Sequence, residues 1–206
     1  MTENRQKTIQ WLCILLYLQL ASVVLSAVIR IAPVLNLSLG GSWVTWIQRC
    51  LNLATMVCLF LLPTQYRKAA IFKLSWLVCS LILIPALAAL RRAGMELYLT
   101  VNSLVSLVSS VLSLVSLYLE YQAHAALSGP GASKKWNILF LCGLGLSLAG
   151  SAAVSIAQPW LTEMVQGGNS GVINWFNLAV WLPSMAVSVA YLVLLRRTVQ
   201  TISNDA

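Results

Sequence analysis

The sequence predicts an all-α integral membrane protein with six transmembrane helices. Of its 206 residues, 59% are hydrophobic and only 9% are charged. An ordinary soluble domain has about 25% charged residues, so a chain of this composition could not cover its own surface in water. The apolar residues also gather in runs of 21 to 24 residues, and a helix needs about 20 to cross a hydrocarbon layer of about 30 Å.

Each apolar run is interpreted as one helix, in a single membrane domain covering residues 1–206. The first run, 9–29, is too long for the apolar region of a typical secretory signal, and no small-x-small cleavage site follows it before Arg30. A membrane β-barrel would show alternating apolar and polar residues, which these runs lack. The other five spans are predicted at 43–63, 69–90, 97–119, 136–157 and 172–195.

Small residues and prolines predict how the helices pack and bend. Ser103, Ser106, Ser110 and Ser113 follow one face of the fourth run, and Gly143, Gly145, Ala149, Gly150 and Ala153 lie in the fifth. Because small residues let membrane helices approach closely, we expect these two helices to form the packed centre. A wet path along the serines toward Glu120 is the alternative. Pro85 and Pro183 predict kinks in the third and sixth helices.

The cations predict the orientation. With the N-terminus inside, nine cations face the cytoplasm and four, all arginines, face outward, which favours two cytoplasmic termini in a plasma membrane. The tryptophans agree, because most fall near the predicted ends of spans, where aromatic side chains prefer the headgroup layers. The inner cations are Arg5, Lys7, Arg67, Lys68, Lys73, Lys134, Lys135, Arg196 and Arg197.

A weak internal repeat also runs through the chain. Each even-numbered helix carries an asparagine near its outer end: Asn52, Asn102 and Asn177. This favours three helical hairpins around an axis along the membrane normal. The alternative is that all hairpins obeying the charge and aromatic rules look alike. In helix number and orientation alone, the architecture resembles the small substrate-binding subunits of energy-coupling vitamin transporters, and that resemblance transfers no ligand residue.

Arginines at membrane depth indicate a candidate binding layer on the outer side. The apolar run after Arg49 has 14 residues, about 21 Å of helix, so the second span must include Arg49. A charge at this depth is costly unless it meets water or a partner. The planar donor fork of arginine suits a carboxylate or phosphate. The candidate ligand-binding residues are Arg30, Arg49, Arg91, Arg92, Asn52, Asn102, Asn177, Trp46, Trp175 and Trp181.

Two alternatives to this layer stay open. Each arginine could extend to the outer headgroups, as long cations at helix ends commonly do, or pair with Glu96 or Glu163. If the layer is a binding site, the glycine-containing segment 158–171 is expected to be a loop that serves as its lid, although the same glycines suit a plain surface turn.

Other chemistry finds little support. The five cysteines form no CxxC pair and lie in different runs, so no metal site is expected. The single histidine, His124, follows Glu120 by four residues; we expect an exposed helix-end pair, with a proton shuttle as the alternative. The segment 128–133, SGPGAS, is expected to be a flexible connector. We predict no catalytic residue and no cofactor. The inner cations suit anionic lipid and require no nucleic acid.

Two function hypotheses follow. The first is a small solute-binding or transport component with an outward-facing site for an anionic molecule or lipid headgroup. The second is an accessory or assembly subunit of a larger membrane complex, motivated by the absence of an acid pair within the spans and of a separate soluble domain. An intramembrane enzyme is a distant third, because the groups needed for catalysis are missing.

Overall fold

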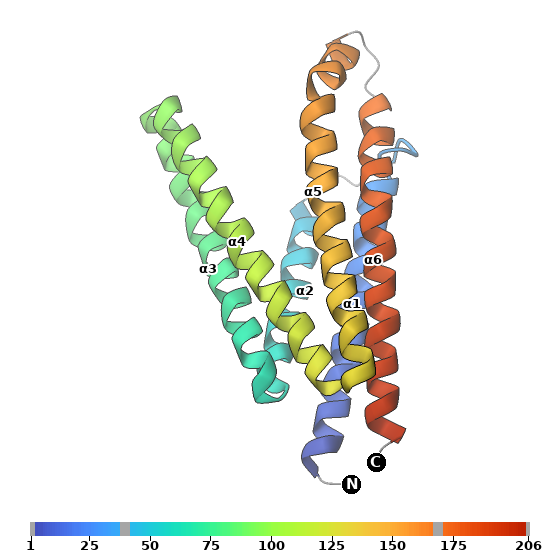
Figure 1. Cartoon of the computed structure of the whole chain (residues 1–206). Coiled ribbons are helices and arrows are strands. Elements are labelled where there is room, and N and C mark those ends of the chain that lie inside the picture. Colours follow the sequence, from blue (N-terminus) through green and yellow to red (C-terminus); the bar gives the residue numbers. More distant parts are fainter. Residues whose placement is uncertain (1–2, 38–41, 167–170, 205–206) are drawn as a thin grey trace. The chain divides into compact units, whose positions relative to one another are not determined.

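The computed structural model describes residues 3–37, 42–166 and 171–204, and every regular element in them is an α-helix (Figure 1). This confirms the all-helical class. By length and composition, three helices could cross a membrane, Glu3–Ile31, Gly131–Gln166 and Gly171–Asn204, and α2 holds a shorter apolar helix, Trp46–Leu61. The helices are α1 (Glu3–Ile31), α2 (Ser42–Leu61), α3 (Thr64–Ala93), α4 (Met95–Leu127), α5 (Pro130–Gln166) and α6 (Gly171–Asn204).

The turn between α4 and α5 is shorter than the sequence predicted. The left-handed conformation of Gly129 (φ 78°) follows the end of α4, as glycine commonly does after a helix. Pro130 then opens α5, where its missing N–H costs nothing and its fixed φ suits the helix. The expectation of a flexible connector over 128–133 was therefore wrong from residue 130 onward.

The predicted lid is also largely helical. Residues 158–166 form the last turns of α5, which continues past Pro159. A proline inside a helix removes one backbone hydrogen bond, while leucine, methionine and glutamine, which are present here, favour the helix. The expectation of a loop was wrong for these residues, and 167–170 lie outside the described residues. α6 likewise continues past Pro183.

Contacts divide the chain into two compact units, one formed by Met1–Thr55 with His124–Ala206 and the other by Met56–Ala123. The single membrane domain predicted from the sequence stays a prediction.

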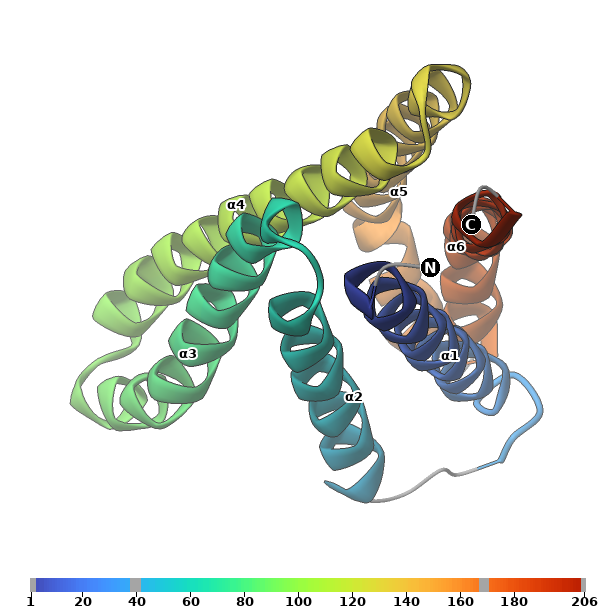
Figure 2. The same cartoon turned by 90° about the horizontal axis from the view of Figure 1, so that it is seen from below.

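In the first unit, α6 packs against both α1 and α5 (Figures 1 and 2). At one end of α6, Arg5 Nη2 on α1 donates to the carbonyl of Ile202 at 2.9 Å. At the other end, Asn174 Nδ2 donates to the carbonyl of Pro33 at 3.2 Å. The first turns of α1 and the last turns of α6 therefore lie at the same end of the unit.

Two glycines allow the close approach of α5 to α6. A Cβ atom added at Gly143 would lie 3.3 Å from Cγ1 of Val187, and one at Gly150 would lie 3.2 Å from Cγ1 of Val180. At Gly145 it would meet no atom within 4 Å. Gly143 and Gly150 thus bring α5 close to α6, whereas Gly145, which the sequence interpretation placed on the packed face, has open space. The packed centre expected between the fourth and fifth helices stays a prediction.

Gly143→Leu is expected to lower the free energy of unfolding by about 1–3 kcal/mol, because a larger side chain would force α5 away from Val187. Gly145→Leu is the matched control, since its site has open space. Both variants are compared with the wild type by thermal unfolding in detergent. Equal melting temperatures for the two variants would contradict the described packing.

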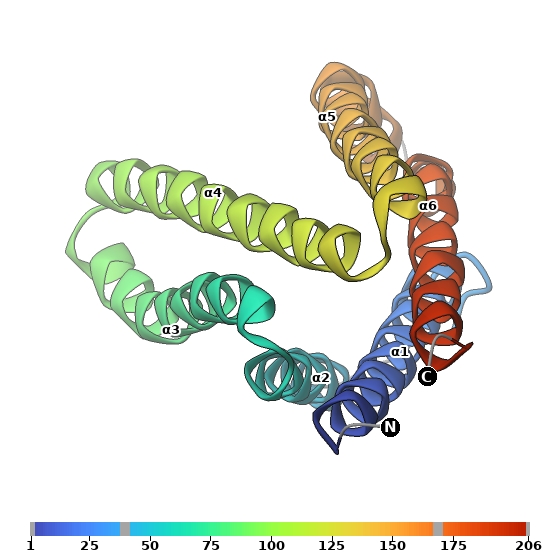
Figure 3. The same cartoon turned by 60° about the horizontal axis from the view of Figure 1, so that its bottom comes forward.

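In the second unit, α3 and α4 run side by side in opposite directions (Figure 3). Ser116 Oγ donates to the carbonyl of Ala69 at 3.0 Å, and Lys73 Nζ lies 3.9 Å from the carboxylate of Glu120. Ser116 lies between the predicted serines and Glu120, and it packs against α3. Ser110 and Ser113 are exposed, and the side chains of Ser103 and Ser106 lie outside the described residues.

Candidate functional site

A pocket of about 480 Å³ opens between α1, α5 and α6 in the first unit. Three of the ten predicted ligand-binding residues line it together: Arg30, Asn177 and Trp181. The remaining lining residues are Leu146, Ser147, Gly150, Ser151, Val154, Ser155, Val180 and Ser184. The pocket is the part of the predicted outer layer that the structure brings together.

The end of α1 places Arg30 beside α6. Arg30 lies in the last turn of α1, and a tight turn with Asn36 in the left-handed region (φ 55°) follows it. The bond from Asn174 to the carbonyl of Pro33 holds this turn against the first turn of α6. Asn177, three residues further along α6, then lies near Arg30 on the pocket wall.

Spacing on the two long helices supplies the rest of the lining. Asn177, Trp181 and Ser184 follow one face of α6 at steps of four and three. Ser147, Ser151 and Ser155 follow one face of α5 at steps of four. Sequence reasoning missed all four serines, although the regular spacing on α5 was the signal that could have found them.

The described lining of the pocket mixes polar and apolar residues, and Arg30 gives it a positive charge. Among the described residues, neither the Arg30 guanidinium nor the Asn177 amide forms a hydrogen bond or an ion pair with another side chain. The pairing of Arg30 with Glu163 that the sequence allowed is not seen in this part of the chain. Ser155 Oγ donates to the carbonyl of Ser151 at 3.0 Å. None of the described residues that line the pocket is acidic, so the field of Arg30 favours an anion.

The other predicted site residues lie elsewhere. The Arg49 guanidinium carbon sits 5.3 Å from the ring centroid of Trp46 on the same helix, a cation–π contact. Neither residue lines the pocket, nor does half-buried Asn52. Trp175 is 62% exposed on α6. Asn102 belongs to the second unit. The side chains of Arg91 and Arg92 lie outside the described residues.

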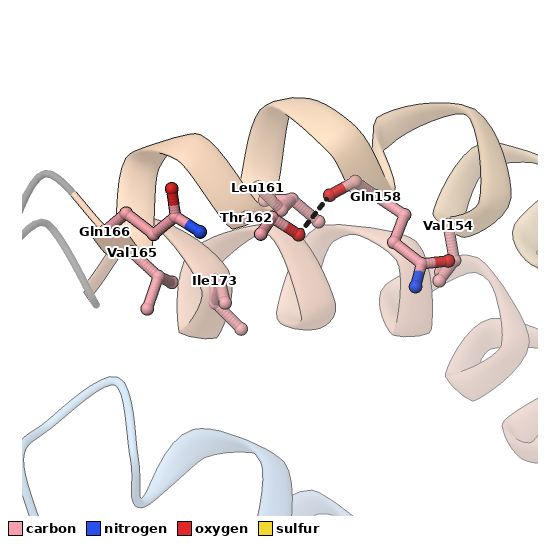
Figure 4. A pocket seen from close by; sticks show the side chains of 7 residues that line it. All are labelled: Val154, Gln158, Leu161, Thr162, Val165, Gln166 and Ile173. Atoms are coloured by element: carbon pink, nitrogen blue, oxygen red, sulfur yellow. Dashed lines mark hydrogen bonds between the residues drawn. The ribbon is translucent and has the colours of Figure 1, made fainter.

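A second pocket, of about 440 Å³, lies further along α5 and includes Ile173 of α6 (Figure 4). Most of its lining is apolar, with the amides of Gln158 and Gln166 at its two ends. Thr162 Oγ1 donates to the carbonyl of Gln158 at 2.8 Å. The lining is completed by Val154, Leu161 and Val165, and Val154 also lines the Arg30 pocket.

At the opposite end of the first unit, His124 lies in a buried aromatic cluster. Its side chain is fully buried, so the expectation of an exposed helix-end residue was wrong. The ring of His124 stacks on Trp136 with centroids 4.6 Å apart, and its Nε2 lies 2.9 Å from the hydroxyl of Tyr191. The indole and phenol, contributed by α5 and α6, exclude water from the imidazole.

Ser128 joins this cluster to the α4–α5 turn. Trp136 Nε1 donates to Ser128 Oγ at 3.1 Å, and the Thr198 hydroxyl lies 2.6 Å from the same oxygen. Ser128 Oγ also lies 2.7 Å from the carbonyl of His124, to which it donates. Hydrogen bonds within the cluster replace those that its buried polar atoms would form with water. The cluster therefore holds α5 and α6 against the end of α4.

In the second unit, Glu120 is buried beside aromatic residues. Its side chain is 4% exposed, and Lys73 approaches it. Burial raises the pKa of both Tyr66 and Tyr121, and the negative charge of Glu120 raises the pKa further. Both phenols therefore stay neutral at physiological pH. The prediction that Glu120 is exposed was also wrong.

Lys73→Met is expected to lower the free energy of unfolding by about 2–4 kcal/mol, because it leaves the buried carboxylate of Glu120 without its cation. Lys73→Met combined with Glu120→Gln is expected to recover most of this loss, since no buried charge remains. Thermal unfolding of the purified protein measures both. Glu120→Gln alone is measured as well. A loss of stability in the double variant that equals the summed losses of the two single variants would contradict a charge pairing.

No group of three or more histidine, cysteine or acidic side chains that could hold a metal ion occurs in residues 3–37, 42–166 and 171–204. No protein-family model, curated protein or solved structure matches this chain. Its function is therefore inferred from its own residues.

Proposed function

We propose that this protein is a small solute-binding or transport component of the plasma membrane, which binds an anionic group at Arg30. The observation that carries the proposal is the pocket lined by both Arg30 and Asn177, in which none of the described lining residues is acidic. A carboxylate or phosphate would accept from the guanidinium fork and from the amide of Asn177. Trp181 would form an aromatic wall, and the serine hydroxyls would donate further bonds.

All six helices are proposed to span the membrane, with both termini in the cytoplasm. Support comes from the excess of cations predicted on that side. It also comes from the bond between Arg5 and the carbonyl of Ile202, because it places the two chain ends on the same side of the first unit. In this topology Arg30 and its pocket face the outside.

Cysteine labelling tests the topology. Gly94→Cys, between α3 and α4, is expected to react with a membrane-impermeant maleimide added to intact cells. Ser133→Cys, in the first turns of α5, is expected to react only after the cells are opened. Both are made in a background without the five native cysteines. External labelling of Ser133→Cys would contradict the proposed orientation.

Anion binding is tested with charged and neutral analogues. The protein in phosphatidylcholine nanodiscs is expected to melt at a higher temperature with benzoate or methyl phosphate, and not with benzamide. If instead only phosphatidylglycerol in the nanodisc raises the melting temperature, the anionic group belongs to a lipid. Stabilisation by neither source would contradict the proposal. If neither source stabilises the protein and it co-purifies with a larger membrane protein, the result would favour the alternative of an accessory subunit.

A further inference from the structure

The apolar pocket beside the Arg30 pocket carries a further inference. The two share Val154 as a lining residue, so they adjoin along α5. From Ser151 to Val165 is 14 residues of continuous helix, about 21 Å at 1.5 Å per residue. One elongated molecule could therefore occupy both pockets.

Most of the apolar pocket lies beyond the hydrocarbon layer in the proposed topology, and Val154 and Ile173 lie at the outer edge of their predicted spans. α5 has 37 residues, about 55 Å of helix, against a hydrocarbon thickness of about 30 Å. Counted from Trp136, where the apolar run begins, the layer ends near Ala157. The turns after it carry exposed Gln158, Glu163 and Gln166, as expected for helix in contact with water or headgroups.

Apolar lining in that position is unusual. In this topology lipid tails do not reach the part of the pocket beyond Ala157. An apolar group that fills an apolar hollow in contact with water lowers the free energy of the system. Leu161 is 8% exposed and Ile173 is half-buried, so the wall is held in place by packing between α5 and α6. Val165 at its rim is 40% exposed and is free to contact a ligand.

We propose that the ligand is an amphipathic carboxylate, whose anionic end binds at Arg30 and Asn177 and whose alkyl chain lies along the pocket of Val154, Leu161, Val165 and Ile173. This deepens the proposed function and rests on it. The positive charge of Arg30 favours an anionic group at that end of the ligand. Because Val154 lines both pockets, an alkyl chain attached to this anionic group could extend into the apolar pocket.

A chain-length series tests the inference. Affinities of octanoate, dodecanoate and hexadecanoate, the last of which is long enough to reach Val165 from Arg30, are measured with the protein in phosphatidylcholine nanodiscs. They are expected to rise about two- to fourfold with each added methylene, because burial of a methylene contributes about a fourfold gain. Val165→Ser and Ile173→Ser are expected to reduce this gain. Partition of the longer acids into the bilayer is the same for all variants, so only the difference between proteins is interpreted.

Ile156→Ser is the matched control, since Ile156 lies on the same helix, is 81% exposed and lines neither pocket. It is expected to keep the chain-length dependence of the wild type. If Val165→Ser and Ile173→Ser both keep it too, while all the acids still require Arg30, the inference is overturned and the proposed anion site survives. If none of the acids binds, the proposed function itself fails.

Discussion

Arg30→Gln is expected to weaken carboxylate binding by about 10- to 150-fold. A hydrogen bond to a charged group contributes about 1.5–3 kcal/mol, and among the lining residues that the structure describes Arg30 alone is cationic. The change keeps a polar side chain of similar length and leaves the fold intact, because Arg30 forms no bond to another side chain among the described residues. Binding of benzoate to purified protein, by calorimetry, measures the effect.

Arg49→Gln is the matched control for Arg30→Gln. Both arginines belong to the layer predicted from the sequence, but Arg49 contacts Trp46 and lies outside the pocket lining. Its loss is expected to change benzoate affinity by less than about threefold, as for a distant charge screened by salt. A larger loss of affinity in Arg49→Gln than in Arg30→Gln would show that the anion binds elsewhere.

Trp136→Ala is expected to cost about 3–5 kcal/mol of stability, the largest effect on folding expected for a single substitution in this chain. The indole is fully buried, stacks on His124 and meets Tyr191 edge to face with centroids 5.4 Å apart. Its removal leaves a cavity between α5 and α6 and takes the indole donor from Ser128. Chemical unfolding in mixed micelles measures the loss.

Trp175→Ala is the control for this prediction, because Trp175 is 62% exposed on α6 and packs little. It is expected to change the free energy of unfolding by less than about 0.5 kcal/mol. Trp136→Phe is expected to recover part of the loss, since a smaller ring still fills some of the cavity. A variant Trp136→Ala as stable as Trp175→Ala would contradict the described cluster.

The helices were predictable from the sequence, and their ends were less so. Long apolar runs locate the helices, because the length of a run and the spacing of its apolar residues are typical of a helix that is removed from water. They do not show how far a polar helix continues beyond the apolar run. α5 extends six residues before Trp136 and nine beyond Ala157, and residues 130–133 and 158–166 of these extensions were expected to be loops.

The sequence predicted how deep the candidate site residues lie in the membrane, but only partly which neighbours their side chains face. Spacing along the chain ordered Arg30, Arg49 and Asn177 at similar depth, but the neighbour that each side chain faces depends on how the helices pack. Arg30 and Asn177 line one pocket because the turn at 32–36, which follows α1, is bonded to the start of α6 through Asn174 and the carbonyl of Pro33. His124 was expected to be exposed for a related reason, since only packing brings Trp136 and Tyr191 over it.

Photoaffinity labelling tests the location of the anion site most directly. A diazirine-bearing benzoate is irradiated with the protein, and the modified residues are identified by mass spectrometry. The proposed site predicts adducts on the stretch of α5 from Ser147 to Ser155 and on α6 from Asn177 to Ser184. These adducts should disappear with excess benzoate and in Arg30→Gln. Adducts confined to other helices, or unchanged by Arg30→Gln, would contradict the proposal that this pocket binds the anion.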